Sequence, residues 1–316
     1  MKKCHLLYVL CLLTLTTACQ TKPYSDDVIC ESYTHRYGVP LKPEEWSERG
    51  RYGQVCSTRR DGVVVTRGYA AGQLQGECSY TFPHSSLIQK KEMYEANRLT
   101  SEVYYYPNGL PQKQVDYNSN GSKTLTKWFD NGSPQRKETY VQGTLWEGEY
   151  FNLNSQVESR VEDGNGIRTR RDNYGQLLST DDIQNGQMAT RRAFHANGVP
   201  ASLTPYQNGV IQGQRSTFAM SGEPLTVESW NNDFQDGVTV SYQNGERYSE
   251  LPYVKGSRQG VEKRYRDGSN LVQEVTWVDD QQHGITVSYF GNTKQTDWYF
   301  EGRHVNKQTF DVLSKQ

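Results

Sequence analysis

The stretch that decides the fold runs from Gly237 to Gly291 and reads GVTVSYQNGERYSELPYVKGSRQGVEKRYRDGSNLVQEVTWVDDQQHGITVSYFG. The pentad VTVSY at 238–242 returns as ITVSY at 285–289, an offset of 47 residues (285 − 238), and the related segment GVEKRY at 260–265 lies midway. The repeating unit is therefore about half of that offset. A fixed period in this range is typical of an architecture that copies one supersecondary element many times.

Turn residues recur with the same period over most of the chain. Asn precedes Gly at positions 108, 131, 197 and 244, and Asp precedes Gly at position 267. Both dipeptides favour hairpin turns with positive φ at both turn positions, so we expect that geometry here. Successive turn positions are 20 to 24 residues apart, and they are Gly109, Gly132, Ser155, Gly175, Gly198, Gly222, Gly245, Gly268 and Gly291.

Between the turns, apolar and polar residues alternate. Val238, Val240 and Tyr242 fall on one side of an extended chain, and Thr239 and Ser241 fall on the other, which indicates a β-strand. A second column marks the strand ends: Tyr117, Tyr140, Val161, Ile183, Tyr206, Trp230, Tyr253, Trp277 and Tyr299. The sequence therefore predicts an all-β fold, an elongated single-layer meander of antiparallel hairpins with a small N-terminal cap.

The composition agrees with β-structure that has exposed faces. Hydrophobic residues make up 34% of the chain, which contains 22 Tyr and 28 Gly, and a disordered chain would be poor in aromatic residues. The formal net charge of −1 gives no reason to expect nucleic acid as a partner. A long sheet with an aromatic-rich face has little chain left to cover it. We therefore expect that it coils on itself, or that a second copy or another protein covers the face.

Four segments follow from this pattern. Residues 1–18 combine a basic start, an apolar run at 6–13 and small residues before Cys19, as in a secretory signal peptide. Residues 19–60 fit no repeat and are expected to form a tether and a cap. Pro43 could begin one short helix there, with Trp46 packed on the first hairpin, and an irregular loop is the alternative. Residues 61–310 form the hairpin array, and residues 311–316 form a C-terminal tail.

The end of the leader resembles a bacterial lipoprotein signal, because Ala18 precedes Cys19. The chain departs from that pattern at Thr16, where the family usually has Leu. The resemblance implies that Cys19 becomes the acylated N-terminus and that two or three acyl chains hold the protein on a membrane. Gln20 in place of Asp implies the outer membrane of the cell envelope. Ordinary signal cleavage at the same bond is the alternative.

Three cysteines remain after the leader and Cys19: Cys30, Cys56 and Cys78. An odd count in an exported chain suggests one disulfide and one free thiol. Cys56 and Cys78 are 22 residues apart, close to one repeat, so the hypothesis is that they lie side by side on neighbouring hairpins and form the disulfide. Three reduced thiols are the alternative, and no spacing of Cys and His indicates zinc.

The array resembles MORN repeats, in the bacterial variant of the YwqK-like proteins. The pattern of Gly, Tyr or Phe, turn Gly, and Tyr or Trp is well kept at Gly213–Phe218–Gly222–Trp230, Gly237–Tyr242–Gly245–Tyr253 and Gly260–Tyr265–Gly268–Trp277. The spacing slips at 83–98 and 151–171. The resemblance covers 62–310 and implies hairpins in an elongated sheet that acts in binding or scaffolding, sometimes near membranes. Some family members are labelled antitoxins, a role that an exported leader argues against.

The sequence contains no arrangement that indicates catalysis. The histidines are scattered, no G-x-S-x-G elbow or phosphate loop is present, and the acidic pairs at 181–182 and 279–280 are expected in solvated turns rather than at a metal. We therefore expect no cofactor and no metal site. An enzyme whose site assembles in space from scattered acids remains the third hypothesis.

Arg168, Arg191 and Arg215 each precede a turn residue by seven positions. In register they would form a column, and Phe194 and Phe218, three residues further on, place them away from that aromatic side. Spaced guanidinium groups suit phosphate or carboxylate ligands, so a site for anionic lipid or glycan is one hypothesis. A solvated face balanced by nearby acids is the alternative. The first expectation for the whole chain is a non-enzymatic, lipid-anchored envelope protein that engages another protein or forms a scaffold.

Overall fold

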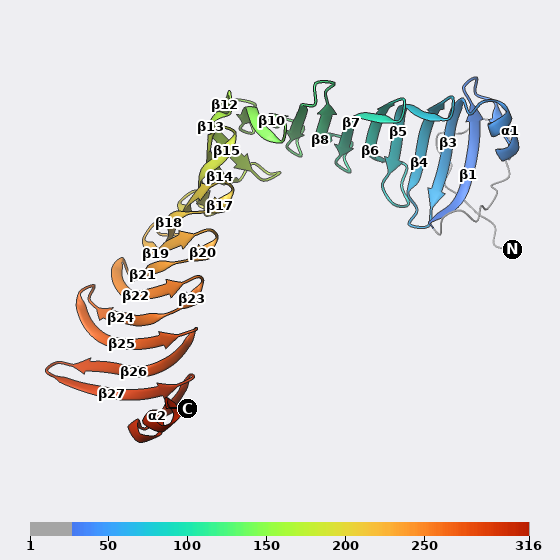
Figure 1. Ribbon diagram of the computed structural model, residues 1–316. Coiled ribbons are helices and arrows are strands. Elements are labelled where there is room, and N and C mark those ends of the chain that lie inside the picture. The colour runs from blue at the N-terminus through green and yellow to red at the C-terminus, as the bar shows by residue number, and fades with distance from the viewer. Residues whose placement is uncertain (1–26, 316) are drawn as a thin grey trace. The chain divides into compact units, whose positions relative to one another are not determined.

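The computed structural model describes residues 27–315, so the leader and the expected lipid site at Cys19 lie outside the described residues. The chain is 65% strand and 4% helix. Its 28 described strands pair antiparallel in chain order and form an open sheet (Figure 1). The expected all-β meander of hairpins is therefore confirmed. Within residues 27–315, no helix has both the length and the apolar character needed to cross a membrane.

The chain divides into two compact units. Unit 1 comprises residues 1–158 and 173–175, and unit 2 comprises residues 159–172 and 176–316. The boundary falls where the turn spacing of the sequence shortens. The described elements of unit 1 are β1 (Val28–His35), β2 (Pro40–Leu41), α1 (Pro43–Glu48), β3 (Gly53–Arg59), β4 (Val64–Ala70), β5 (Gln73–Thr81), β6 (Ile88–Glu95), β7 (Arg98–Tyr105), β8 (Pro111–Tyr117), β9 (Lys123–Trp128), β10 (Pro134–Val141) and β11 (Thr144–Phe151).

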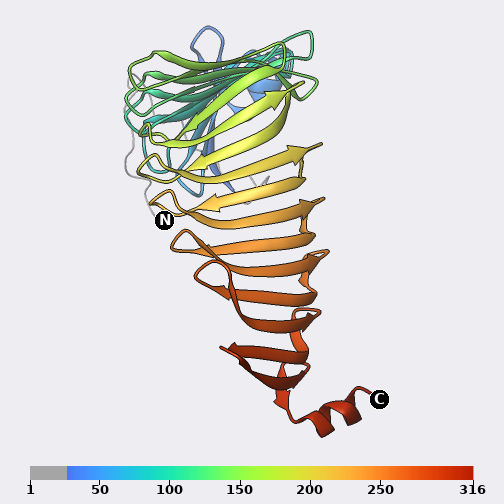
Figure 2. The ribbon, with the colours of Figure 1, turned by 90° about the vertical axis from the view of Figure 1, so that its left-hand side faces the viewer.

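In unit 2 the strands follow one another toward the C-terminal helix (Figure 2). Strand β12 (Val157–Glu162) contains the boundary residue 158. The other elements are β13 (Asn165–Arg171), β14 (Leu177–Gln184), β15 (Gln187–Phe194), β16 (Pro200–Gln207), β17 (Val210–Ile211), β18 (Gly213–Phe218), β19 (Pro224–Asn231), β20 (Phe234–Gln235), β21 (Gly237–Gln243), β22 (Glu246–Val254), β23 (Ser257–Arg258), β24 (Gly260–Arg266), β25 (Asn270–Val278), β26 (Gln281–Phe290), β27 (Thr293–Phe300), β28 (Arg303–Val305) and α2 (Lys307–Leu313).

In unit 2, four strand-end aromatic residues each lie opposite a glycine on the preceding strand. The pairs in unit 2 are Gly213–Trp230, Gly237–Tyr253, Gly260–Trp277 and Gly284–Tyr299.

The turns follow the predicted positions. Three of the five Asn-Gly and Asp-Gly turns differ from the expected type, in which both turn residues have positive φ. Asn244 and Asp267 have positive φ like the glycines after them, as expected. At 108, 131 and 197 only the glycine has positive φ. In the first of these loops the N–H of Gly109 donates to Tyr106 and the N–H of Tyr106 donates to Leu110, so three residues lie between the paired ends. Such a loop needs positive φ only at its last residue.

At the opposite margin, reciprocal hydrogen bonds join neighbouring hairpins. The N–H of Ile211 donates to the Asp233 carboxylate at 2.7 Å, and the N–H of Asp233 donates back to the Ile211 carbonyl at 3.2 Å. The amide of Gln212 accepts from the N–H of Asn232 at 3.0 Å. The same arrangement joins Leu74–Gln75 to Ala96–Asn97 and Arg258–Gln259 to Asp279–Asp280. These clamps satisfy turn groups that a hairpin alone would leave to water.

A short helix lies at each end of the described chain. Trp46 of α1 is 8% exposed and packs with Tyr33, Leu41 and Val55, so the expected helix and its contact are present. Strands β1 and β3 already belong to the sheet, although they lie inside the segment that we expected to be tether and cap. Helix α2 was not predicted, because seven residues with little apolar periodicity give a weak signal.

Candidate functional site

The arginine column lies in register on unit 2, as expected, but carboxylates alternate with it. Arg168 on β13 and Arg191 on β15 both lie directly opposite Asp181 on β14. Nη2 of Arg168 donates to Oδ2 of Asp181 at 2.8 Å, and Nε of Arg191 donates to Oδ1 at 2.8 Å. Asp181 is 0% exposed. Two of the three guanidinium groups are therefore directed at one buried carboxylate.

The two arginines determine the ionisation of Asp181. Burial alone would raise its pKa, but the hydrogen bonds from Arg191 and Arg168 outweigh that effect and hold the pKa below the ordinary value. The same contact raises the pKa of Arg191. Asp181 was expected in a solvated turn, and this expectation is wrong, because the residue lies in the middle of β14 and faces both neighbouring strands.

The third arginine has a carboxylate partner as well. Nη1 of Arg215 donates to Glu228 at 3.0 Å, and the indole N–H of Trp230 donates to the same carboxylate at 2.8 Å. The guanidinium carbon lies 5.9 Å from the centre of the Trp230 ring. The arginine side chains thus share their face with the column of strand-end aromatic residues. The sequence could have predicted this carboxylate partner, because an acid two residues before a strand-end residue points to the same face of the sheet as that residue.

The same arrangement continues along the strands that follow. Glu262 accepts from Nε and Nη2 of Arg264 at 2.9 Å each and from the indole N–H of Trp277 at 2.9 Å. Arg258 lies over the Trp277 ring at 3.9 Å. We call this side of unit 2 the network face, defined by Arg168, Asp181, Arg191, Glu228 and Glu262. Its charges largely neutralise one another within the chain.

The other side of unit 2 exposes apolar side chains. Val238 is 47% exposed, Val261 is 44% exposed and Ile285 is 40% exposed. The residues that follow them by one position, Thr239, Glu262 and Thr286, are buried on the network face, so all three apolar side chains point away from that face. Strand pairing sets Val238 opposite Pro252, Val261 opposite Thr276, and Ile285 opposite Trp298. We call this side the open face, and these six residues the apolar row.

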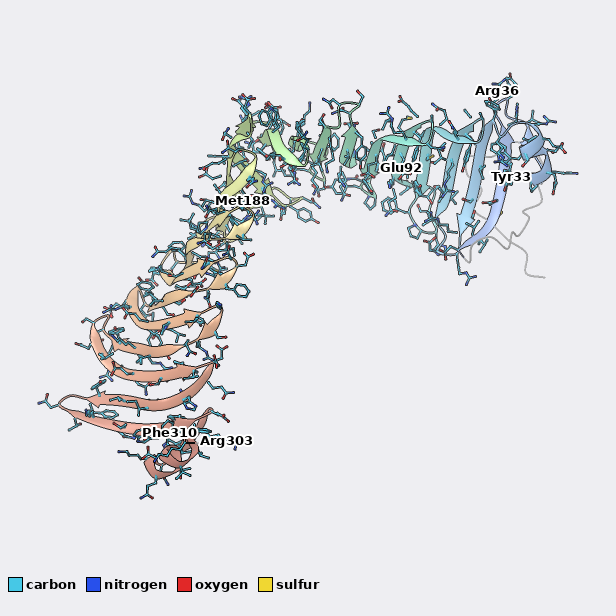
Figure 3. All side chains as sticks on the ribbon, viewed as in Figure 1. Tyr33, Arg36, Glu92, Met188, Arg303 and Phe310 are labelled. Carbon is cyan, nitrogen blue, oxygen red and sulfur yellow. The ribbon has the colours of Figure 1, made fainter. Side chains whose placement is uncertain are left out.

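Helix α2 docks on the end of the apolar row. The Phe310 ring lies 5.0 Å from Trp298 and 6.2 Å from Phe300, which share one side of β27. Figure 3 labels Phe310 on the C-terminal helix. His283 on β26 lies 5.6 Å from the same ring. Phe310 therefore covers the last part of the row, whereas Val238, Val261 and Ile285 remain exposed.

Unit 1 contains a cleft of about 640 Å³ at the margin of its first strands. Gly68 lies on β4, between Gln54 on β3 and Glu77 on β5. Glu77 forms an ion pair with Lys91 at 3.0 Å, and Arg36 lies over the Tyr52 ring at 5.3 Å. No nucleophile is hydrogen-bonded to a base in these contacts. Within residues 27–315, no group of three or more His, Cys, Asp or Glu is placed to hold a metal ion.

The expected disulfide between Cys56 and Cys78 is absent, and the prediction is wrong. Cys56 lies opposite Thr66 on β4, whereas Cys78 lies opposite Arg67. The two cysteines flank the same strand, about 9.6 Å apart across two strand spacings, and they point to opposite faces. A disulfide needs Cα atoms closer than about 7 Å. Cys30 is disulfide-bonded, and its bond involves neither of these two cysteines.

No family model matches the chain, and no curated protein matches it. Solved structures match only weakly. TarM from S. aureus, in complex with fondaparinux, α-GlcNAc-glycerol and UDP, is 11% identical with a TM-score of 0.19, and the match covers 43% of this chain and 21% of TarM. The TcdB2-TccC3 structure is 10% identical with a TM-score of 0.20 and covers 87% of this chain. This chain spans about a fifth of its length, 21%.

A porin-like protein from Bacteroides uniformis is 7% identical, with a TM-score of 0.11, over 77% of this chain and 88% of that protein. Similarity at this level carries no argument about function. The functional conclusion therefore depends on the residues and contacts of this chain.

Proposed function

We propose that this chain is a non-enzymatic β-repeat protein of a bacterial cell envelope that engages another protein through the open face of unit 2. The observation that carries the proposal is the exposure of Val238, Val261 and Ile285 on one side of a sheet. A sheet normally buries its apolar side against a second layer. Apolar residues that gather on an exposed surface usually mark an interaction site.

The difference in polarity between the two faces supports this proposal. On the network face, the carboxylates of Asp181, Glu228 and Glu262 are buried and hydrogen-bonded within the chain. These three carboxylates already have hydrogen-bond partners within the chain, so they are not available to a partner protein. The open face offers apolar area that is still in water and that gains free energy when it is covered.

The test is a cross-linking pull-down of the mature chain from envelope extract, with a triple variant Val238→Lys, Val261→Lys and Ile285→Lys beside it. We expect the native chain to retain a specific protein and the variant to lose it. The matched control carries the same change at exposed apolar residues of unit 1, namely Leu87→Lys, Met93→Lys and Leu110→Lys, and is expected to retain the partner. Equal capture by all three chains would contradict the proposal.

We further propose that a lipid at Cys19 attaches the chain to the outer membrane, on the strength of the Ala18-Cys19 junction and Gln20. Cys19→Ala should move the protein from the membrane fraction to the soluble fraction. Mass spectrometry of the N-terminal fragment of the native chain should find the acyl chains. An unmodified Cys19 in the mature chain would show ordinary signal cleavage instead.

The alternative function, binding of anionic lipid or glycan by the arginine column, has a specific observation against it. Arg168 and Arg191 share Asp181, and Arg215 contacts Glu228, so each guanidinium group of the column already contacts a carboxylate of the chain. We expect the triple variant with Ala at these arginines to bind phosphatidylglycerol vesicles as the native chain does. A loss of vesicle binding by a variant that keeps its circular dichroism would restore the alternative.

A further inference from the structure

The apolar row crosses the strands of unit 2 at nearly constant spacing. Its exposed members Val238, Val261 and Ile285 lie on β21, β24 and β26, each two strands from the next. Pro252 on β22 and Thr276 on β25 lie between them. Since neighbouring strands are about 4.8 Å apart, the exposed residues recur every ~9.6 Å.

This spacing matches one face of an α-helix that lies across the strands. Seven residues of helix rise by about 10.5 Å, and three or four residues rise by about 4.5 to 6 Å. Apolar side chains at i, i+3 or i+4, and i+7 would therefore contact successive members of the row. From Val238 to Ile285 the row crosses four strand spacings, about 19 Å, which corresponds to a helix of about 13 residues.

The chain itself provides an example of a helix on this face. Helix α2 brings Phe310 against Trp298 and His283, the latter two positions before Ile285 on the same side of β26. The free part of the row is continuous with this contact. The surface that accepts an aromatic side chain from α2 thus extends beyond α2 along three further exposed residues.

A border of charged residues runs beside the row on the open face. Strand pairing sets Glu250 opposite Lys263 and Lys263 opposite Glu274, which forms a line of alternating charge. An apolar centre with a polar rim is the usual make-up of a specific interface. A helix with apolar residues on one face and both signs of charge beside them matches this surface.

From this geometry we propose that the apolar row binds an amphipathic helix of a partner protein, laid across β21 to β26 beside α2. The proposal rests on the proposed function and names the kind of partner. The helix presents apolar side chains at i, i+3 or i+4, and i+7 to Val238, Pro252, Val261, Thr276 and Ile285. Binding supplies the second layer that the sheet of unit 2 lacks on this side among the described residues.

The direct test uses a synthetic helical peptide of about 16 residues with leucine at i, i+4, i+7 and i+11 and with Lys and Glu elsewhere. Binding to the full chain is measured by fluorescence anisotropy. The control peptide has the same composition with its four leucines at i, i+2, i+4 and i+6, a spacing that favours a strand. We expect the helical peptide to bind and the control peptide not to bind. Equal affinity of the two peptides would overturn the proposal.

A variant pair localises the binding. Val261→Asp places a charge in the middle of the row, and we expect it to weaken binding of the helical peptide about tenfold or more. Lys263→Ala alters only the charged border, and we expect a smaller loss of affinity for the helical peptide. Circular dichroism and the unfolding midpoint verify that both variants fold. Unchanged affinity of a folded Val261→Asp chain would overturn the proposal.

The native partner separates this inference from the proposed function. A photo-crosslinking amino acid at position 261 of the full chain captures the partner segment in envelope extract, and mass spectrometry identifies it. A helical segment supports the inference. An extended segment, or a second copy of this chain packed sheet to sheet, would overturn the inference but leave the proposed protein-interaction function standing. Capture of no protein at all would contradict the proposed function.

Discussion

The two units stabilise the same kind of hairpin with different side chains. Among the described residues of unit 1, twelve apolar side chains and six polar or charged ones are buried. Unit 2 reverses the balance, with four apolar and nine polar or charged. Unit 1 thus depends mainly on the removal of apolar area from water. Unit 2 depends mainly on hydrogen bonds and ion pairs, and it leaves apolar area exposed on the open face.

The same repeat pattern is thus compatible with a buried apolar residue in one unit and a buried charged residue in the other. Val65 on β4 is 0% exposed and so is Asp181 on β14, although both lie near the middle of a strand. A buried carboxylate is tolerated only when charged partners compensate its desolvation. Arg168 and Arg191 provide that compensation for Asp181.

The largest effect is expected for Asp181→Ala. The change removes the carboxylate that both guanidinium groups contact and should lower the free energy of unfolding by about 3 to 5 kcal/mol. Hydrogen exchange read by mass spectrometry should rise in β13 to β15 and remain unchanged in β3 to β5. The control is Asp182→Ala, at an exposed position on the other side of β14, which should have almost no effect. Similar losses for both variants would break the comparison.

The matching change in unit 1 is Val65→Ala. It opens a cavity in a fully buried apolar site and should cost roughly 2 kcal/mol, with faster exchange confined to β3 to β5. Val64→Ala, at the neighbouring and less buried position, is the control. If Val65→Ala accelerated exchange in unit 2 as strongly as in unit 1, the two units would not have separate sources of stability.

A smaller effect is expected from acid. Because the folded pKa of Asp181 is lowered, its contribution to stability is full above the unfolded pKa of about 3.9 and is lost as the pH falls from there toward the folded pKa. The difference in unfolding free energy between the native chain and Asp181→Asn should therefore be large at pH 7 and shrink below about pH 4. A difference that does not change with pH would contradict the ion-pair explanation.

The smallest effect is expected at the clamps. Asp233→Ala removes the acceptor for the N–H of Ile211 and leaves an alanine at φ 65° without the hydrogen bond that stabilises this conformation. We expect the free energy of unfolding to fall by about 1 to 2 kcal/mol. Asp233→Asn keeps an acceptor and should be nearly neutral. Chemical denaturation of the two variants measures the difference. An unchanged free energy of unfolding in Asp233→Ala would mean that water replaces the hydrogen bond of the clamp.

Much of this fold could be predicted because the decisive signals are local. A turn glycine needs only its own positive φ, and alternation along a strand needs only neighbours two residues apart. The hairpin positions, the all-β class and the register of Arg168, Arg191 and Arg215 could therefore be predicted, whereas the segment after Pro43 was left open between a helix and an irregular loop. The type of several turns was missed, because Asn-Gly fits a three-residue loop as well as a two-residue one.

Only the tertiary structure decided what each side chain meets. Cys56 and Cys78 are one repeat apart in sequence, yet they point to opposite faces of the sheet, because Thr66 and Arg67 between them face opposite ways. The sequence predicts that Asp181 is a surface acid, but strand pairing places an arginine on each side of it. Cross-strand contacts depend on register, and register depends on loop lengths and bulges summed along the chain. For that reason the sequence places the strands, and their pairing determines the chemistry of the two faces.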